Sequence, residues 1–356
     1  MAYSMGVETQ NHPLLHISKR ECSLIVVNPF VPPFGGKHMQ LETTRLGQSG
    51  LEITRVGIGT APIGSNPSWS IYWGPQNESE AIRAIDVALD LGVNWIDTAP
   101  FYGWGRAEQI VGKALQGKRD RVYIFTKCGT LPNEQGGWRE DLTPASIRRE
   151  IEASLRRLQS DYIDLYQFHD PDPLTPIEES WATMQTLIQE GKVRYGGLSN
   201  HPIDLVQRAM TVAPITSNQH QYNLLHRAIE HDVLPFSQQH GIGVLAWSPL
   251  ASGFLTGDFD LESLDAQDFR RRHPYAEAQT YARLKRVREM LQVIAQDHHK
   301  KLTDLAIAWV LRQPALTGAI MGIRSEREAQ EMAGGVNWKL TGQEIQAIEQ
   351  ALALWT

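Results

Sequence analysis

Four residues of complementary chemistry, Asp97, Tyr102, Lys127 and His169, stand at or just after the ends of predicted strands. A tyrosine phenol with a pKa of about 10 is a weak acid, but a neighbouring ammonium favours the phenolate and lowers that pKa. A buried lysine in turn needs a carboxylate, and a neutral histidine can donate a hydrogen bond to a carbonyl without adding charge. The set predicts a site that protonates a carbonyl oxygen, with Tyr102 as the acid.

Taken one at a time, three of these residues have ordinary structural interpretations. Asp97 could cap a loop, Lys127 could be a solvated strand-end lysine, and His169 could be a satisfied core histidine. Together they match hydride chemistry better than hydrolysis, because no serine or cysteine nucleophile is flanked by a convincing base. The histidines show no metal-binding spacing. Cys128 is expected to point away from Lys127, since neighbours on a strand face opposite sides.

The elements that must position these residues alternate along the chain. Apolar residues at helical spacing mark 78–91, 144–158, 176–189 and 302–312. The expected strands are 56–59, 95–97, 122–126, 163–169, 193–199, 215–219, 244–247 and 318–321. Eight strands alternating with helices predict an α/β fold, a (β/α)8 TIM barrel. A doubly wound sheet is the competing architecture, but no G-x-G-x-x-G turn follows the first strand.

Three further segments complete the expected fold. Residues 44–55 hold two short alternating runs around a turn and predict an N-terminal β-hairpin that caps the barrel. The irregular segment 253–280 is expected to form a large loop over the barrel mouth. Extra helices are expected near the C-terminus.

In such a barrel, chemistry sits at the C-terminal ends of the strands. Asp97, Lys127 and His169 end three consecutive strands, and Tyr102 lies in the loop 100–105, whose two glycines allow it to fold over the mouth. The polar residues that end or follow the next three strands are Ser199, Asn200, Gln219 and Ser248. We expect all of them at one rim of the barrel.

The composition argues against several classes of protein, namely nucleic-acid-binding, membrane-spanning and disulfide-rich proteins. The 356 residues carry a net charge of -6 with both signs interspersed, which gives no case for nucleic acid or an anionic membrane as partner. No apolar run approaches the ~18 residues of a membrane span. The only cysteines, Cys22 and Cys128, cannot form a disulfide scaffold, so a cytoplasmic location is expected. The sequence leaves the oligomeric state open.

Residues 1–38 differ in character from the rest. A short apolar stretch, 22–27, precedes three prolines and two glycines between positions 28 and 36. This pattern discourages regular structure and does not match a signal peptide. We expect either a disordered tail or a true start at Met39, with 39–356 forming a single barrel domain.

Four segments resemble the aldo-keto reductase superfamily, and the likeness extends roughly from 41 to 335. They are 92–103 with Glu108 and Gly112, then 125–127, 162–169 and 191–200. The resemblance implies an NADP(H)-dependent carbonyl reductase that uses no metal. It assigns Tyr102 as general acid, Lys127 and Asp97 as the pair that tunes it, and His169 as the donor that orients the carbonyl. The sequence is more similar to the bacterial general-stress and sugar-dehydrogenase-like branch than to steroid reductases.

The same resemblance implies a dinucleotide site. At the nicotinamide end it assigns Ser199, Asn200 and Gln219 to the carboxamide and Tyr222 to stacking on the ring. The remaining contacts would come from Ser248, Leu250, Gly253, Gly322, Arg324, Ser325 and Glu328. Within this set, Arg324 would bind the 2′-phosphate of NADPH. Asp258, Glu328 and Met332 depart from the family pattern, so NADH stays possible.

The substrate is expected to be a small-molecule carbonyl compound. Phe101 and Trp104 are the expected pocket walls, with Trp69, Trp73 and Trp138 as further candidates. Two alternatives stay open. One is an NADP(H)-binding regulatory subunit with slow turnover, and the other is a sugar 1-dehydrogenase in which Tyr102 acts as the base.

Overall fold

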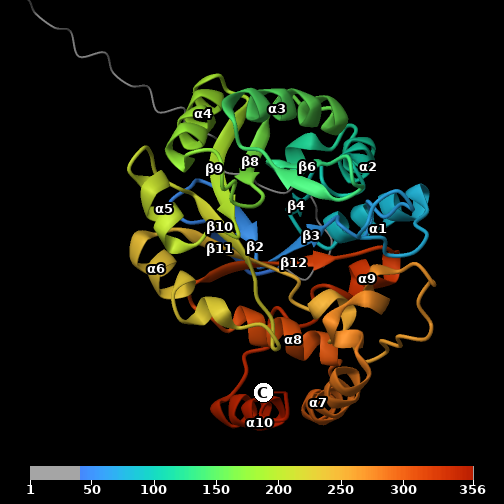
Figure 1. Cartoon of the computed structure of the whole chain (residues 1–356). Helices are drawn as coiled ribbons and strands as arrows, with labels where there is room; N and C mark the ends of the chain where they lie inside the picture. Colours follow the sequence, from blue (N-terminus) through green and yellow to red (C-terminus); the bar gives the residue numbers. More distant parts are fainter. Residues whose placement is uncertain (1–40, 356) are drawn as a thin grey trace, which may run out of the picture. The chain divides into compact units, whose positions relative to one another are not determined.

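The computed structural model describes residues 41–355, and the predictions for residues 1–38 fall outside this range. Within it, eight parallel strands close into a barrel surrounded by helices (Figure 1), which confirms the predicted (β/α)8 fold. The barrel order is β10-β11-β12-β3-β4-β5-β8-β9. No helix in the described part of the chain has both the length and the apolar character that a membrane crossing requires.

The barrel strands match the predicted positions closely. Three have the predicted bounds at both ends of the strand, and the others differ by one or two residues at one or both ends. Their bounds are β3 Val56–Gly59, β4 Trp95–Asp97, β5 Tyr123–Cys128, β8 Ile163–Phe168, β9 Val193–Ser199, β10 Ser217–Gln221, β11 Gly243–Trp247 and β12 Leu316–Gly322.

Several helices, among them α1, α3, α9 and α10, begin at a residue whose side chain caps the first turn. In α3 the Thr143 side chain accepts a hydrogen bond from the Ser146 N–H and Pro144 occupies the first turn, while Ile147 and Ile151 are buried. The helices are α1 Glu78–Asp90, α2 Arg106–Ala114, α3 Pro144–Leu158, α4 Ile177–Gln189, α5 Ile203–Met210, α6 Val233–His240, α7 Ala278–Gln296, α8 Leu302–Leu311, α9 Glu326–Glu331 and α10 Gly342–Leu352.

The predicted hairpin forms from β1 (Thr43–Arg45) and β2 (Glu52–Thr54) and supplies apolar side chains to the barrel interior. The Trp95 indole N–H donates to the Thr54 carbonyl at 2.8 Å, which ties the hairpin to β4. A Cβ on Gly57 of β3 would overlap the Trp95 ring, so this close approach requires glycine. The fully buried cluster that results is Leu46, Leu51, Ile53, Trp95, Phe125, Leu165 and Leu245.

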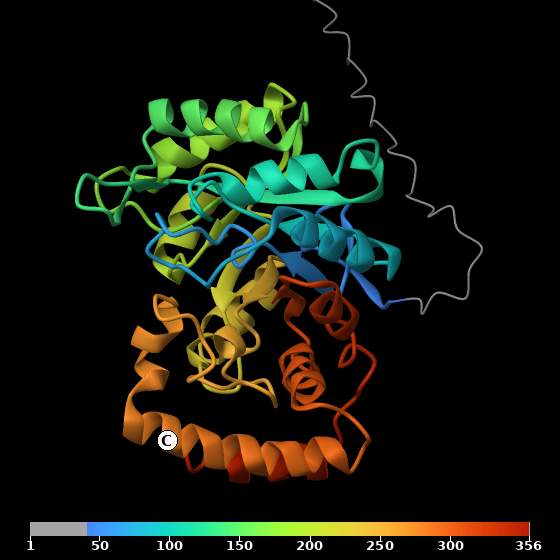
Figure 2. The same ribbon diagram turned by 90° about the vertical axis from the view of Figure 1, so that its right-hand side faces the viewer.

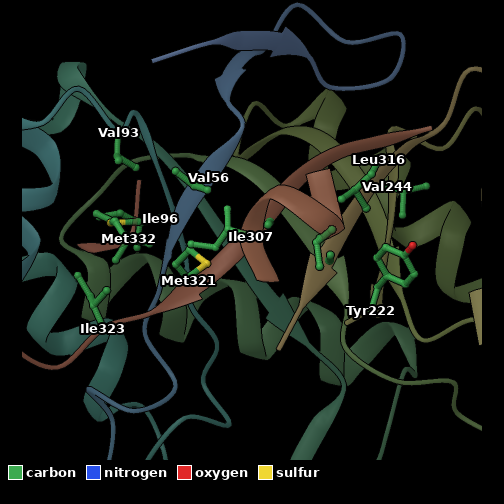
Figure 3. Close-up of a cluster of buried hydrophobic side chains, with 14 of the residues drawn as sticks. Val56, Val93, Ile96, Tyr222, Val244, Ile307, Leu316, Met321, Ile323 and Met332 are labelled. Atoms are coloured by element: carbon green, nitrogen blue, oxygen red, sulfur yellow. The ribbon is translucent and has the colours of Figure 1, made fainter. Parts of the chain in front are cut away.

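A second, larger core lies between the strands and the helices. Figure 3 shows part of it, in which labelled side chains of β3, β4, β11 and β12 belong to the same buried cluster as Ile307 of α8. The sequence did not predict the small hairpin of β6 (Thr130–Pro132) and β7 (Trp138–Glu140). Near the C-terminus, α7 and α10 pack against each other beside the barrel, as Figure 2 shows along its lower edge.

Candidate active site

Three strand ends and one loop bring the predicted acid and its partners together. The Lys127 ammonium donates to Asp97 Oδ1 at 2.5 Å, to the Thr98 carbonyl at 3.1 Å and to Tyr102 Oη at 3.1 Å. Its three N–H groups are therefore all used. The Tyr102 and His169 rings meet edge to face with centroids 5.7 Å apart. The arrangement leaves the phenol and the imidazole side by side at the barrel rim.

The loop that carries Tyr102 depends on backbone that only glycine tolerates. Gly103 adopts a φ of 65°, and a Cβ there would overlap the Gly64 carbonyl. The Tyr102 N–H donates to the Ala99 carbonyl at 3.1 Å, which closes the turn after β4. This turn brings the phenol back over the end of Lys127.

Two buried glutamines donate hydrogen bonds to Asp97, the carboxylate that pairs with Lys127. Asp97 Oδ2 accepts from Gln219 Nε2 at 2.9 Å and from Gln167 Nε2 at 3.3 Å. Gln219 Nε2 also donates to Gln167 Oε1 at 3.3 Å. Asp97 and Lys127 are 1% and 0% exposed, so their charges face each other with little screening. Sequence reasoning missed Gln167, although it lies two residues before His169 on the same face of β8.

Burial and charge act in opposite directions on the Tyr102 phenol. Burial raises its pKa, and although the Lys127 charge lowers it, the pKa stays above the ordinary value. The predicted effect of Lys127 on the pKa is present, but desolvation outweighs it, so the expectation that the pKa falls towards neutral pH is wrong. Tyr102 is accordingly protonated at neutral pH, as a proton donor must be.

The other two titratable groups have well-defined charge states. Burial acts to lower the pKa of Lys127, but the nearby Asp97 and Tyr102 outweigh it and the pKa is raised, so the lysine stays charged. Burial, with a smaller contribution from Lys127, holds the pKa of His169 well below its usual range. The imidazole is neutral at pH 7 and can donate a hydrogen bond without adding charge.

These residues open onto a cavity of about 680 Å³. Asp97, Tyr102 and His169 line it, and the loops after several strands form its walls. The predicted mouth loop does cover it, because Asp258, Phe259, Phe269 and Arg270 are among the lining residues; α7 begins at Ala278, slightly before the predicted end of that loop. Of the predicted cofactor residues, those on the wall are Ser199, Asn200, Gln219, Ser248, Leu250, Gly253, Gly322, Arg324 and Glu328.

A profile of the Aldo/keto reductase family matches residues 55–353. The chain belongs to the aldo-keto reductase family. It is 36% identical over 316 residues to the aldo-keto reductase YhdN of Bacillus subtilis, an alignment that covers 88% of this chain and 94% of that protein. It is 33% identical over 309 residues to a protein of Escherichia coli named NADH-specific methylglyoxal reductase, covering 83% and 94%.

Solved structures of other aldo-keto reductases share the fold. The glycerol dehydrogenase AKR11B4 of Gluconobacter oxydans matches with a TM-score of 0.79 and 35% identity, covering 87% of this chain and 95% of that one. The aldo-keto reductase AKR11C1 of Bacillus halodurans matches with a TM-score of 0.71 and 31% identity, covering 88% and 96%.

The aldo-keto reductase cavity fits a nicotinamide carboxamide on one side. Ser199 Oγ is buried on the cavity wall and has no hydrogen-bond partner among the described residues. Asn200 adopts a φ of 57°, and its amide donates to the His169 carbonyl while its Oδ1 accepts from Trp247 Nε1 at 3.0 Å. An orphaned hydroxyl beside a fixed amide is a suitable set for an amide ligand.

Tyr222 lies elsewhere, so the stacking role predicted for it is wrong. The side chain is fully buried in the core outside the barrel, where Figure 3 shows it near Val244 and Leu316. Its hydroxyl donates to Glu230 Oε1 at 2.5 Å, and its ring stacks on Trp309 at 5.3 Å. The aromatic ring that does line the cavity at this side is Trp247, at the end of β11.

The loop after β11 bends sharply beside the cavity. Ser248, Ala251 and Ser252 all have φ between 48° and 56°, and Gly253 has a φ of 92°. The Ser248 side chain stabilises this turn by accepting from the Ser252 N–H at 3.0 Å. Several left-handed non-glycine residues in one short loop are unusual and concentrate at ligand sites.

At the far end of the cavity, Arg324 is already engaged. Its guanidinium donates to the Trp73 carbonyl, the Pro75 carbonyl and Gln76 Oε1 at 2.6, 2.6 and 2.9 Å. Glu328 Oε2 accepts from the Arg324 N–H at 2.6 Å. Ser325 does not line the cavity, because its side chain caps α9. A 2′-phosphate would have to displace carbonyl partners of Arg324 and approach a carboxyl group.

Part of the predicted substrate wall lies on the cavity. Phe101 lines the cavity and meets the His169 ring at 5.5 Å. Trp104 does not line it but packs behind Phe101, at 5.4 Å, so the prediction for Trp104 is wrong. Trp69 and Trp73 do line the cavity, whereas Trp138 packs against Phe101. Asp170, directly after His169, also lines the cavity and was not predicted from sequence.

Proposed function

We propose that this protein reduces aldehydes or ketones to alcohols, with Tyr102 as the general acid. A bound nicotinamide dinucleotide would supply a hydride to the carbonyl carbon. The observation that supports the proposal is the single contact at 3.1 Å between the Lys127 ammonium and the hydroxyl of a protonated, cavity-lining tyrosine. Such a pair can protonate an alkoxide oxygen as charge develops on it.

Each member of the site has a distinct task in this reaction. Tyr102 Oη gives its proton to the carbonyl oxygen, and the ammonium of Lys127 stabilises the phenolate left behind. Asp97 keeps the buried lysine charged through the 2.5 Å contact. His169, neutral at pH 7, donates to the same carbonyl oxygen and holds it within reach of Tyr102.

The cofactor is proposed to lie with its nicotinamide near Ser199, Asn200 and Trp247. Ser199 Oγ is available to the carboxamide, and the Trp247 indole offers the cavity a flat apolar face. NADP(H) is the proposed dinucleotide because Arg270, Arg324 and Arg327 line the far end. The engaged guanidinium of Arg324 and the adjacent Glu328 favour NADH as the alternative.

The test follows NADPH oxidation by absorbance with 4-nitrobenzaldehyde, with NADH in parallel. Tyr102→Phe removes the proton donor and is expected to lower kcat by about a hundredfold or more. The matched control is Tyr166→Phe, which removes a hydroxyl from a buried residue of β8, the strand that ends just before His169, but outside the cavity. It should leave kcat near the wild-type value. The ratio of kcat/KM for the two dinucleotides decides the cofactor.

Three results would contradict parts of this proposal. Equal loss in Tyr102→Phe and Tyr166→Phe would remove the specific role of Tyr102. Dinucleotide binding, followed by tryptophan fluorescence, without turnover of any carbonyl compound would indicate the regulatory function. Faster oxidation of sugars than reduction of aldehydes would reverse the direction, with Tyr102 as the base.

A further inference from the structure

Asp170 places a second carboxyl group on the cavity wall beside the proton donor. It follows His169 directly in the chain and lines the same cavity as Tyr102. Its negative charge reaches the Tyr102 phenol, whose pKa it helps to raise. Asp97 already balances the charge of Lys127, so Asp170 is not needed for that purpose.

The position of this carboxyl group is fixed by neighbours. Asn200 Nδ2 donates to Asp170 Oδ1 at 2.8 Å, and the same amide accepts from the Trp247 indole through its Oδ1 at 3.0 Å. A chain of hydrogen bonds from Trp247 through Asn200 thus orients Asp170. A side chain held in this way presents a defined acceptor to the cavity.

Asp170 has two side-chain hydrogen-bond donors, Asn200 and Thr130, and its carboxyl oxygens can accept a further hydrogen bond from a ligand in the cavity. Phe101, Trp69 and Ile71 add apolar surface to the wall of the same cavity. Among the ion pairs of residues 41–355, none includes Asp170. Burial raises its pKa to about 6, against the opposing effect of the Asn200 hydrogen bond. A partly desolvated carboxyl group of this kind gains from a ligand that supplies an O–H donor.

We propose that Asp170 determines substrate specificity by accepting a hydrogen bond from a hydroxyl group next to the reacting carbonyl. The inference rests on the proposed reductase function and names its substrate class. The site selects neutral hydroxylated aldehydes and ketones over unsubstituted carbonyl compounds of the same size. It disfavours substrates with a carboxylate at this place, because two negative charges would repel each other.

The experiment compares glycolaldehyde with propanal, which have equal numbers of non-hydrogen atoms, through the ratio of their kcat/KM values. In Asp170→Leu this ratio should fall about tenfold or more relative to wild type, while propanal turnover is retained. Asp170→Asn keeps an oxygen for Asn200 and should lower the ratio less. Differences in intrinsic reactivity and hydration between the two aldehydes cancel when enzymes are compared.

Asp258→Asn is the matched control, because it removes a carboxylate from the same cavity at the side where Arg327 pairs with it. It should leave the ratio unchanged. Equal ratios in wild type, Asp170→Leu and Asp170→Asn, with both aldehydes turned over, would overturn this inference alone. No turnover of either aldehyde by the wild-type enzyme would overturn the reductase function and this inference with it. If Asp170→Leu does not fold, the ratio measured for Asp170→Asn is compared with that of wild type, and an unchanged ratio would overturn the inference.

Discussion

Glu150 shows how burial changes the chemistry of a single carboxyl group. It lies on α3, 5% exposed, where both carboxyl oxygens accept from the Gly129 N–H at 3.2 Å and Ser146 Oγ donates to one of them. Burial raises its pKa to about 7, although these hydrogen bonds oppose the shift. The folded state therefore holds a proton that the unfolded chain would release at lower pH.

Because the pKa of Glu150 is higher in the folded state than in the unfolded chain, the unfolding free energy falls as the pH rises. Stability contributed by protonated Glu150 is present below the unfolded pKa and is lost as the pH rises through about 7. The loss amounts to about 3 kcal/mol. Glu150→Gln should flatten the fall in unfolding free energy between pH 5 and pH 8, measured by urea denaturation. Glu152→Gln, on the exposed side of the same helix, should keep the wild-type dependence, and equal slopes in all three proteins would contradict the assignment.

At the scale of elements, the β1–β2 hairpin supplies part of the barrel floor. Leu51 is fully buried against barrel residues, so Leu51→Ala should lower the unfolding free energy by about 3 kcal/mol. Leu174→Ala removes the same atoms from a side chain that is 88% exposed and should change stability by less than about 0.5 kcal/mol. Neither residue lines the cavity, so kcat should be kept in both. Comparable unfolding free energies for the two variants would show that the hairpin contributes little.

Strand alternation explains which of the predicted site residues reach the cavity. Residues of β5 and β11 that share the interior face with Phe125 and Leu245 include Lys127 and Trp247. In β10 the interior face carries Gln219 and Gln221, so Tyr222, one residue beyond Gln221, falls on the outer side. The two-residue period, applied past the end of β10, would have excluded Tyr222 and selected Trp247.

Other features depend on tertiary context that the sequence does not carry. The β6–β7 hairpin is short and polar, with no apolar alternation to mark it. Trp104 and Trp69 have the same chemistry, and only the packing around Phe101 decides which ring reaches the cavity. The net pKa of Tyr102 likewise depends on how deeply the loop buries it, which a list of neighbours cannot supply.

At the scale of the whole molecule, the described elements account for the barrel, its floor and its cavity. The residues that line the cavity run from Gly59 to Met332, and the hairpin begins at Thr43. A chain that starts at Met39 should therefore keep the melting temperature and kcat of the full chain. A chain that starts at Val56 loses Leu46, Leu51 and Ile53 from the floor and should not fold stably. A large loss of either property in the first truncation would show that residues 1–38 contribute.

The packed floor of the barrel determines the route by which ligands enter and leave the cavity. Because Leu46, Leu51 and Trp95 belong to a buried cluster that fills the barrel interior, ligands cannot reach the cavity through the floor of the barrel. A dinucleotide and a carbonyl compound would therefore both enter from the rim, and the deeper of the two would have to bind first. The β1–β2 hairpin lies far from the catalytic residues, but by closing the floor it restricts ligand entry and release to the rim of the barrel.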